Sequence, residues 1–328
     1  MNFAINGFGR IGRAIFRLSL DSGNDCVAIN EPNASFEDVC YFLKYDSLYG
    51  TLNAVLKKNS DDSFVISKDE KTLLVKIFCC TNLDEFISNF SDDVVIIESN
   101  GKAEHIDYYK KNQRKVIFTF SNKTIENEII FGVNEHNSKK GMCPNIVSGS
   151  ICDTVAIAPV LQSVYSVVDI KYTLITTMHP ALSYQKVIDN YLDVPQNRSL
   201  GRQYIDSIIP KRTSAEEILS KVFFKDNNIR CLSFRIPTES VCSADITFVA
   251  NEDVDAESVI QSLKKCNYLS FSNDDLVSID YKASQASAIV DMRWLEVIGN
   301  RILKILIWYD NEYGYSARIL DLLEHYYE

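Results

Sequence analysis

The chain has 328 residues, of which 46 % are hydrophobic, and its formal net charge is −10. This length exceeds one ordinary domain, so we expect two. The negative charge and the lack of a basic block argue against nonspecific binding to nucleic acid. No apolar run reaches the roughly 18 residues of a membrane span, and no signal peptide opens the chain, so we expect a cytoplasmic protein.

A dinucleotide fingerprint opens the chain. A short apolar run over residues 2–6 leads into Gly7-Phe8-Gly9-Arg10-Ile11-Gly12, and a helical pattern of apolar residues follows. Gly7 permits a tight turn, Gly9 lets the backbone approach a pyrophosphate, and Gly12 lets the helix pack on the strand. Because the strand, the glycines and the helix occur in this order, the pattern predicts a dinucleotide site.

The next predicted strand, residues 26–30, leads directly into Glu31, roughly 20 residues after the fingerprint. A carboxylate at this position accepts hydrogen bonds from the adenosine ribose and repels a 2′-phosphate. The sequence therefore predicts NAD rather than NADP as the cofactor. The alternative is that Glu31 is a solvated loop residue.

Helical and strand-like segments alternate through the first 150 residues. A helix is expected at 36–45, with strands at 71–78, 94–98 and 115–120. This alternation predicts a doubly wound Rossmann domain over 1–150, with a mostly parallel sheet and the ligand at the carboxyl ends of its strands. Two further candidate cofactor contacts at such ends are Ser99 and Thr119.

A thiol lies where a helix is predicted to begin. The run Asn145-Ile146-Val147-Ser148-Gly149-Ser150-Ile151 ends at Cys152, and a helical pattern follows to about Val168. The positive end of a helix favours a thiolate, and the free N–H groups there can receive an oxyanion. His179, which ends a strand-like run, is the candidate partner that activates the thiol. The alternative is that Cys152 is a small buried apolar residue.

The nine cysteines are scattered and show no CxxC spacing. This pattern favours reduced thiols over a disulfide framework or a zinc site, so we expect no metal.

After residue 150 the strands follow one another without regular helices between them. Strands are expected at 171–178, 230–236, 241–250 and 301–309, separated in part by a polar, irregular segment over 189–211. These segments predict an α+β domain over 151–313 with a mixed or antiparallel sheet and helices on one face. An amphipathic C-terminal helix within 314–328 is expected to join the first domain.

Motifs along the whole chain resemble the glyceraldehyde-3-phosphate dehydrogenase family. They are Ala4 to Arg13, Tyr45-Asp46-Ser47, the Ser-rich approach to Cys152 with Ala158-Pro159, Thr176-Thr177-Met178-His179 with Gln185-Lys186, Phe234-Arg235-Ile236-Pro237-Thr238, and Trp308 to Ser316. Their order and spacing follow the family. The resemblance implies NAD-dependent, glycolytic oxidation of an aldehyde, a homotetramer, and a segment 189–211 that reaches the cofactor site of an adjacent subunit.

The resemblance also implies the roles of individual residues. Cys152 corresponds to the nucleophile and His179 to its base, Glu31 to the ribose-binding acid, Asn311 to the group that holds the nicotinamide carboxamide, and Arg235 to a ligand of the substrate phosphate. The expected cofactor contacts are Gly7, Phe8, Gly9, Arg10, Ile11, Glu31, Ser99, Thr119, Asn311 and Tyr315. In this mechanism a thiohemiacetal forms on Cys152, hydride passes to NAD, and inorganic phosphate releases the thioester.

Several positions that bind phosphate in the family differ here. The family's Ser-Cys-Thr-Thr-Asn reads Ile151-Cys152-Asp153-Thr154-Val155, its two threonines after the histidine read Leu182 and Tyr184, and its Thr-Gly reads Thr213-Ser214. Hydroxyls donate to a phosphate dianion, whereas an ionised Asp153 cannot donate and repels it. Of the phosphate ligands, Arg235 and Thr213 are retained.

Three hypotheses follow from these differences. The first is an NAD-dependent dehydrogenase that acts on glyceraldehyde 3-phosphate or a close relative such as erythrose 4-phosphate. The second applies the same chemistry to a different or non-phosphorylated aldehyde, with release of the thioester to water. The third is a paralogue that binds NAD and serves as a regulatory or scaffold protein.

Overall fold

The computed structural model describes residues 1–137, 144–191, 197–223 and 228–327. The chain divides into two compact units, Met1–Ile151 with Tyr315–Glu328, and Cys152–Gly314. Within the described ranges, no helix has both the length and the hydropathy that crossing a membrane requires.

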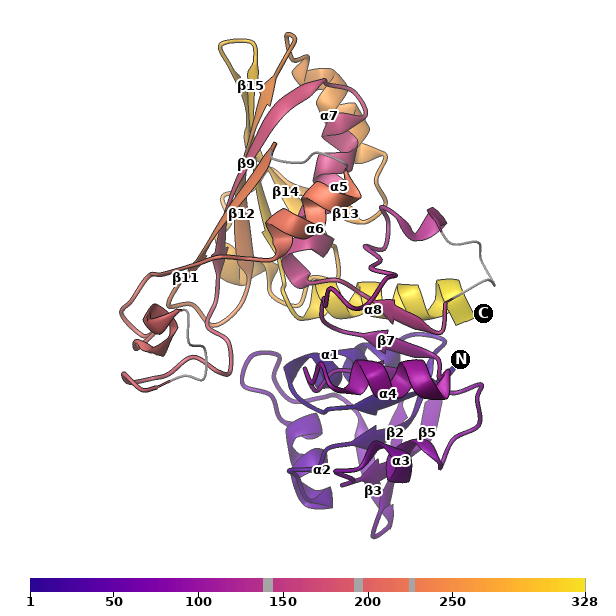
Figure 1. The fold of residues 1–328 in the computed structure, drawn as a ribbon. Coiled ribbons are helices and arrows are strands. Elements are labelled where there is room, and N and C mark those ends of the chain that lie inside the picture. Colours follow the sequence, from indigo (N-terminus) through magenta and orange to yellow (C-terminus); the bar gives the residue numbers. More distant parts are fainter. Residues whose placement is uncertain (138–143, 192–196, 224–227, 328) are drawn as a thin grey trace. The chain divides into compact units, whose positions relative to one another are not determined.

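The first unit contains an eight-stranded sheet in the order β3-β4-β5-β2-β1-β6-β7-β8 (Figure 1). Its elements are β1 (Asn2–Asn6), α1 (Arg10–Ser19), β2 (Asp25–Asn30), α2 (Phe36–Lys44), β3 (Val55–Ser60), β4 (Ser63–Lys68), β5 (Lys71–Phe78), α3 (Leu83–Ile87), β6 (Val95–Glu98), α4 (His105–Asn112), β7 (Val116–Phe118), η1 (Glu135–Asn137), β8 (Ile146–Ser148) and most of α8 (Tyr313–Tyr327). Strands β5, β2, β1, β6, β7 and β8 are parallel, as predicted. The antiparallel additions β3 and β4 were not predicted.

Helices pack on both faces of this sheet. Phe86 of α3 and Tyr109 of α4 belong to one buried cluster with Ala4, Ile96 and Phe118 of the strands. On the other face, a Cβ placed on Gly12 of α1 would lie 3.2 Å from the side chain of Ile5. Because neighbouring residues of a strand point to opposite faces, Ala4 and Ile5 serve the two layers. The doubly wound fold is thereby confirmed.

The second unit contains a seven-stranded mixed sheet in the order β10-β11-β9-β12-β15-β14-β13. Its elements are α5 (Cys152–Tyr165), β9 (Ile170–His179), η2 (Arg198–Gly201), β10 (Ile209–Lys211), α6 (Ala215–Val222), β11 (Ile229–Arg235), β12 (Cys242–Ala250), α7 (Ala256–Lys264), β13 (Leu269–Ser272), η3 (Ser278–Tyr281), β14 (Ala288–Ile298) and β15 (Ile302–Tyr309). Helices α5, α6 and α7 lie together on one face, as expected (Figure 1). The sequence did not predict α6 and α7 between the strands.

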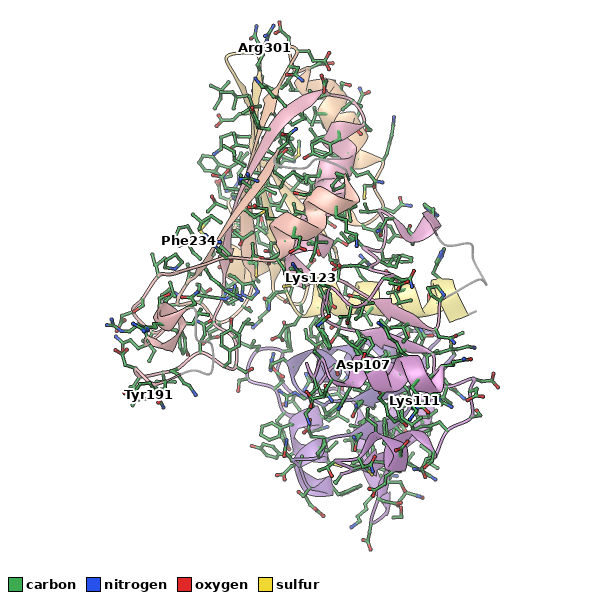
Figure 2. All side chains as sticks on the ribbon, in the orientation of Figure 1. Asp107, Lys111, Lys123, Tyr191, Phe234 and Arg301 are labelled. Carbon is green, nitrogen blue, oxygen red and sulfur yellow. The ribbon has the colours of Figure 1, made fainter. Side chains whose placement is uncertain are left out.

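The opposite face of this sheet carries exposed apolar side chains. Alternate residues of β9, β11 and β15, among them Tyr172, Leu174, Leu232 and Ile302, point away from the helices and are exposed. The segment 189–211, expected to be irregular, contains η2 and β10, while residues 192–196 lie outside the described chain. In this segment Tyr191 is almost fully exposed, at 97 % (Figure 2).

Candidate active site

The loop that precedes Cys152 is held by its own serine hydroxyls. Ser148 Oγ donates to the Phe120 carbonyl at 2.8 Å, and Ser150 Oγ donates to Glu128 Oε1 at 2.9 Å. Ser150 adopts φ +60°, a left-handed conformation that costs a non-glycine residue free energy. The small polar residues of this run therefore serve the sharp entry into α5, which begins at Cys152.

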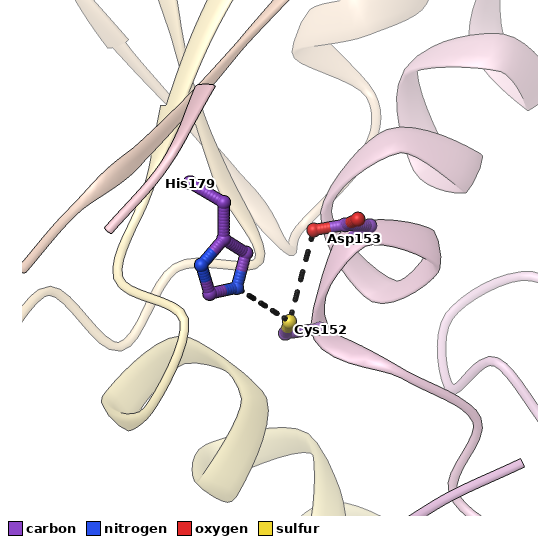
Figure 3. Close-up of side chains that lie close together, drawn as sticks. All are labelled: Cys152, Asp153 and His179. Atoms are coloured by element: carbon purple, nitrogen blue, oxygen red, sulfur yellow. Dashed lines mark hydrogen bonds between the residues drawn. The ribbon is translucent and has the colours of Figure 1, made fainter. Parts of the chain in front are cut away.

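Cys152, Asp153 and His179 come together at the start of α5 (Figure 3). Cys152 Sγ lies 3.6 Å from His179 Nε2 and 3.7 Å from Asp153 Oδ1. The other ring nitrogen, Nδ1 of His179, is 2.8 Å from the Pro180 carbonyl, which can only accept, so Nδ1 carries the proton. The lone pair of Nε2 then faces the thiol. This is the geometry of a thiol with its general base.

The surroundings of this pair favour its neutral form. Burial raises the pKa of the Cys152 thiol, and the Asp153 carboxylate raises it further. Burial lowers the pKa of His179 to about 4, and the positive charge of Arg235 acts in the same direction. These two shifts oppose the effect of the helix N-terminus, which favours a thiolate. The proton must move from Sγ to Nε2 when a substrate is attacked.

Asp153 is a buried carboxylate, 4 % exposed, with two hydroxyl donors. The Tyr309 hydroxyl donates to Oδ1 at 2.8 Å, and Thr213 Oγ1 donates to Oδ2 at 3.3 Å. Tyr309 itself is fully buried, and its pKa is raised by burial and by the Asp153 charge. Sequence reasoning missed Tyr309. Burial alternates along β15 in the structure, but its sequence is apolar at nearly every position and does not indicate which side chains face α5.

Strand register brings Arg235 beside His179. The two residues pair across β11 and β9, so their side chains share the face that α5 covers. Arg235 is 6 % exposed, and its Nε and Nη1 atoms have no hydrogen-bond partner among the described residues. Thr177 and Ser233 are register partners two residues before His179 and Arg235, so they share the same face. Their hydroxyls are likewise buried and have no partner in the described chain. Unpaired buried donors of this kind fit an anionic ligand.

A second cation borders this face. Lys211 of β10 pairs with Ser233, and its charge also lowers the pKa of His179. Lys211 Nζ lies 3.4 Å from the Tyr184 hydroxyl and 5.9 Å from the centre of the Tyr184 ring. Leu182 instead shapes a turn, because its N–H donates to Gln185 Oε1 at 3.0 Å. Tyr184 and Leu182 were predicted to lie near the anion, whereas Lys211 was not.

In the first unit, the glycine turn has the shape expected of a pyrophosphate cradle. Gly7 has φ +100°, and a Cβ there would lie 2.6 Å from the Asn100 nitrogen. Ser99 Oγ donates to the Gly7 carbonyl at 2.6 Å, so this side chain supports the turn. At Gly9, the N-cap of α1, a Cβ would meet no protein atom within 4 Å, and no side chain caps the helix. The N-terminus of α1 therefore has open space beside Gly9, which fits a phosphate.

Glu31 lines a pocket of about 180 Å³ together with Phe8, Arg13, Asn33, Ala34, Asp38, Val39 and Phe42. Its Oε2 atom accepts a hydrogen bond of 2.8 Å from the Phe8 N–H. The carboxylate is thus fixed at the carboxyl end of β2, beside the glycine turn. The position fits an adenosine ribose.

The remaining predicted cofactor contacts differ in their surroundings. Arg10 forms an ion pair with Asp46, and Ile11 follows it in the first turn of α1. Thr119 N–H donates to the Glu98 carbonyl at 3.0 Å, and the Tyr315 hydroxyl donates to the Ser150 carbonyl at 3.2 Å. Asn311 belongs to the second unit, and its buried Oδ1 atom has no partner among the described residues.

Comparisons with known proteins cover nearly the whole chain. Residues 1–106 match the family model "Glyceraldehyde 3-phosphate dehydrogenase, NAD binding domain", and residues 151–311 match "Glyceraldehyde 3-phosphate dehydrogenase, C-terminal domain". Glyceraldehyde-3-phosphate dehydrogenase 2 of Bacillus subtilis (strain 168) is 33 % identical over 98 % of this chain and 95 % of its own length. The cytosolic glyceraldehyde-3-phosphate dehydrogenase of Taxus baccata is 31 % identical over 99 % and 97 %.

These matches span both units and agree with the glycine turn of the first and the Cys–His pair of the second. The cofactor is NAD. The chain therefore belongs to the glyceraldehyde-3-phosphate dehydrogenase family and is an NAD-dependent dehydrogenase.

Proposed function

We propose that the protein oxidises glyceraldehyde 3-phosphate, or a close sugar-phosphate relative such as erythrose 4-phosphate, through a thiohemiacetal and a thioester on Cys152. The observation that carries this proposal is the 3.6 Å approach of His179 Nε2 to Cys152 Sγ at the first residue of α5. The curated relatives named above support the substrate class.

The first step is attack of Cys152 Sγ on the aldehyde carbon. His179 Nε2 takes the thiol proton as the C–S bond forms, because the neutral imidazole presents its lone pair to Sγ. The N–H groups in the first turn of a helix point toward its N-terminal end, so those of α5 are placed to stabilise the developing oxyanion. His179 then returns the proton to that oxygen, which gives the neutral thiohemiacetal.

The second step is oxidation of the thiohemiacetal. NAD, when bound, accepts the hydride from the former aldehyde carbon. His179 Nε2 takes the hydroxyl proton in the same step, so that a thioester remains on Cys152. The buried Oδ1 atom of Asn311 is a free acceptor that suits the amide of the nicotinamide. Asn311 therefore serves to orient the ring.

Recognition of a phosphorylated substrate is assigned to Arg235. Its buried Nε and Nη1 donors, which have no partner in the described chain, match the oxygens of a phosphate. Thr177 and Ser233 add hydroxyl donors on the same face, and Lys211 adds a charge. These groups compensate for the two missing threonines at Leu182 and Tyr184.

A single-turnover experiment tests the proposal. Mixing the NAD-loaded enzyme with a panel of phosphorylated and plain aldehydes should give a burst of one NADH per subunit, largest with the phosphorylated compounds. A burst that is largest with a plain aldehyde would favour the second candidate, which the carboxylate of Asp153 beside Sγ supports. Bound NAD without any burst would leave a regulatory or scaffold role.

We also propose that the chain assembles as a homotetramer in the cytoplasm. The exposed apolar residues of the second sheet, including Leu174 and Leu232, are support for a subunit contact. Light scattering should give four times the chain mass, and Leu174→Asp should lower it. A monomer at micromolar concentration would contradict the proposal.

A further inference from the structure

The Asp153 carboxylate has no task in the two steps above, although it is the acid nearest to the reacting sulfur among the described residues. Oδ1 lies 3.7 Å from Cys152 Sγ, and all three reactive atoms of Cys152, Asp153 and His179 lie within 4.8 Å of one another. An acyl group on Sγ would thus lie within reach of the carboxylate through one water molecule. A buried charge at this point requires an explanation.

The structure holds this carboxylate in one orientation. The Tyr309 hydroxyl at 2.8 Å comes from β15, and the Thr213 hydroxyl at 3.3 Å comes from the loop before α6. Two hydroxyl donors satisfy part of the acceptor capacity of a carboxylate and leave lone pairs toward Sγ. The carboxylate is therefore fixed, and it can accept a proton from a further donor at the sulfur.

His179 is a poor candidate for the step that follows oxidation. In the proposed mechanism Nε2 has just taken the hydroxyl proton, so it enters that step as an acid. A second base beside the thioester allows the attacking nucleophile to lose its proton at once. Asp153 occupies the position for such a base, while its charge repels a phosphate dianion.

We propose that Asp153 is the catalytic base that releases the thioester to water. This inference rests on the proposed function and names the acceptor of its last step. The water oxygen bonds to the acyl carbon as one water proton passes to Asp153. The C–S bond then breaks, and Sγ leaves with the electron pair and takes the proton from His179. The products are a carboxylic acid and the free thiol, with no change of oxidation state.

The test compares the NADH burst with steady-state turnover in phosphate-free buffer. The wild type should turn over without phosphate and form a carboxylic acid that carries one oxygen atom from ¹⁸O-labelled water. Asp153→Asn should keep the burst but lower steady-state turnover by about 100-fold. The acyl-enzyme should then accumulate, visible as a mass increase of the intact chain. Unchanged turnover in Asp153→Asn would overturn the inference.

Controls separate this role from damage to the fold. Asp291→Asn makes the same change at a buried carboxylate of β14, one held by Arg293 and Trp308, and should leave the ratio of burst to turnover unchanged. Tyr309→Phe should slow release by a smaller factor with the burst intact, because Asp153 loses a donor. Strict phosphate dependence of the wild type, with an acyl phosphate as product, would overturn the inference alone. Absence of any wild-type burst would overturn the proposed function with it.

Discussion

The glycine turn of the first unit and the charged cluster of the second, which consists of Arg235, Lys211 and Asp153, follow different rules of construction. The turn depends on backbone geometry, since Gly7 has φ +100° and leaves no room for a Cβ beside Asn100. The charged cluster depends on side chains, since its three charges act on the Cys152–His179 pair. Backbone constraints admit almost no substitution, whereas a set of side chains can be exchanged for another set with different chemistry.

The two sites therefore differ in how closely their residues follow the family pattern. The nucleotide site keeps the glycine fingerprint, while Asp153 and three apolar or aromatic side chains, Ile151, Leu182 and Tyr184, stand where the resemblance places hydroxyls. The new anion of Asp153 acts on His179 together with two cations, Arg235 and Lys211. We therefore expect the largest effects at Cys152 and His179, smaller effects at the glycine turn, and the smallest at Lys211, on the outer edge of the charged cluster.

The largest effect is expected for Cys152→Ala. Loss of the nucleophile should remove the NADH burst and lower turnover by at least about 10⁴-fold, with NAD affinity unchanged. Stopped-flow absorbance and calorimetric titration with NAD give the two values. Cys79→Ala removes an exposed thiol of the first unit and is the matched control. A burst that survives in Cys152→Ala would show that the chemistry lies elsewhere.

The next largest effect concerns His179 and pH. Its pKa is lowered to about 4, so the basic form of the imidazole is available above that pH and is lost as the pH falls through it. We expect kcat/KM to stay flat down to about pH 5, and His179→Gln to reduce it by roughly 10²–10⁴-fold. A pH profile of the wild type checks the first point. An acid limb centred near 6.5 would contradict the burial argument.

Much of the fold could be predicted from the sequence because the spacing of apolar residues and the residues that end helices and strands are local features. The fingerprint, the buried strands and the helix after Cys152 can each be recognised from a short stretch of the sequence. The β3–β4 hairpin was missed because four of the six residues of its outer strand are polar and nearly all are exposed. No local pattern indicates that His105 lies partly buried beside Glu98, 3.1 Å from Oε2.

The site could be predicted in its residue types but not in its charges. Cys152 and His179 could be predicted because one begins a helix and the other ends a strand. The contact of Tyr309 with Asp153 joins residues far apart in the chain and depends on the packing of α5 on the sheet. The protonation of the thiol also depends on burial, which no local pattern records.

Within the glycine turn, a pair of substitutions separates folding from binding. Gly7→Ala places a Cβ 2.6 Å from backbone at positive φ, and should lower the free energy of unfolding by at least about 1–2 kcal/mol. Gly9→Ala meets no protein atom within 4 Å, so it should weaken NAD binding and leave stability nearly unchanged. Urea unfolding and NAD titration measure the two effects. Equal destabilisation by both variants would contradict the assignment of open space at Gly9.

The smallest effect is expected at the edge of the charged cluster, for Lys211→Ala. Lys211 on β10 pairs with Ser233 on β11 and contacts Tyr184, so it reaches the face where Arg235 is buried. Loss of this partly exposed charge should raise KM for a phosphorylated aldehyde by about 10-fold, or 1.4 kcal/mol, because one charge-assisted contact is removed. KM for the corresponding plain aldehyde should not change, and neither should the burst amplitude. Lys221→Ala, at the far end of α6, is the matched control for loss of a lysine. Equal increases of KM for both aldehydes would mean that Lys211 shapes the site without recognising the anion, and the phosphate would then be bound by Arg235 alone.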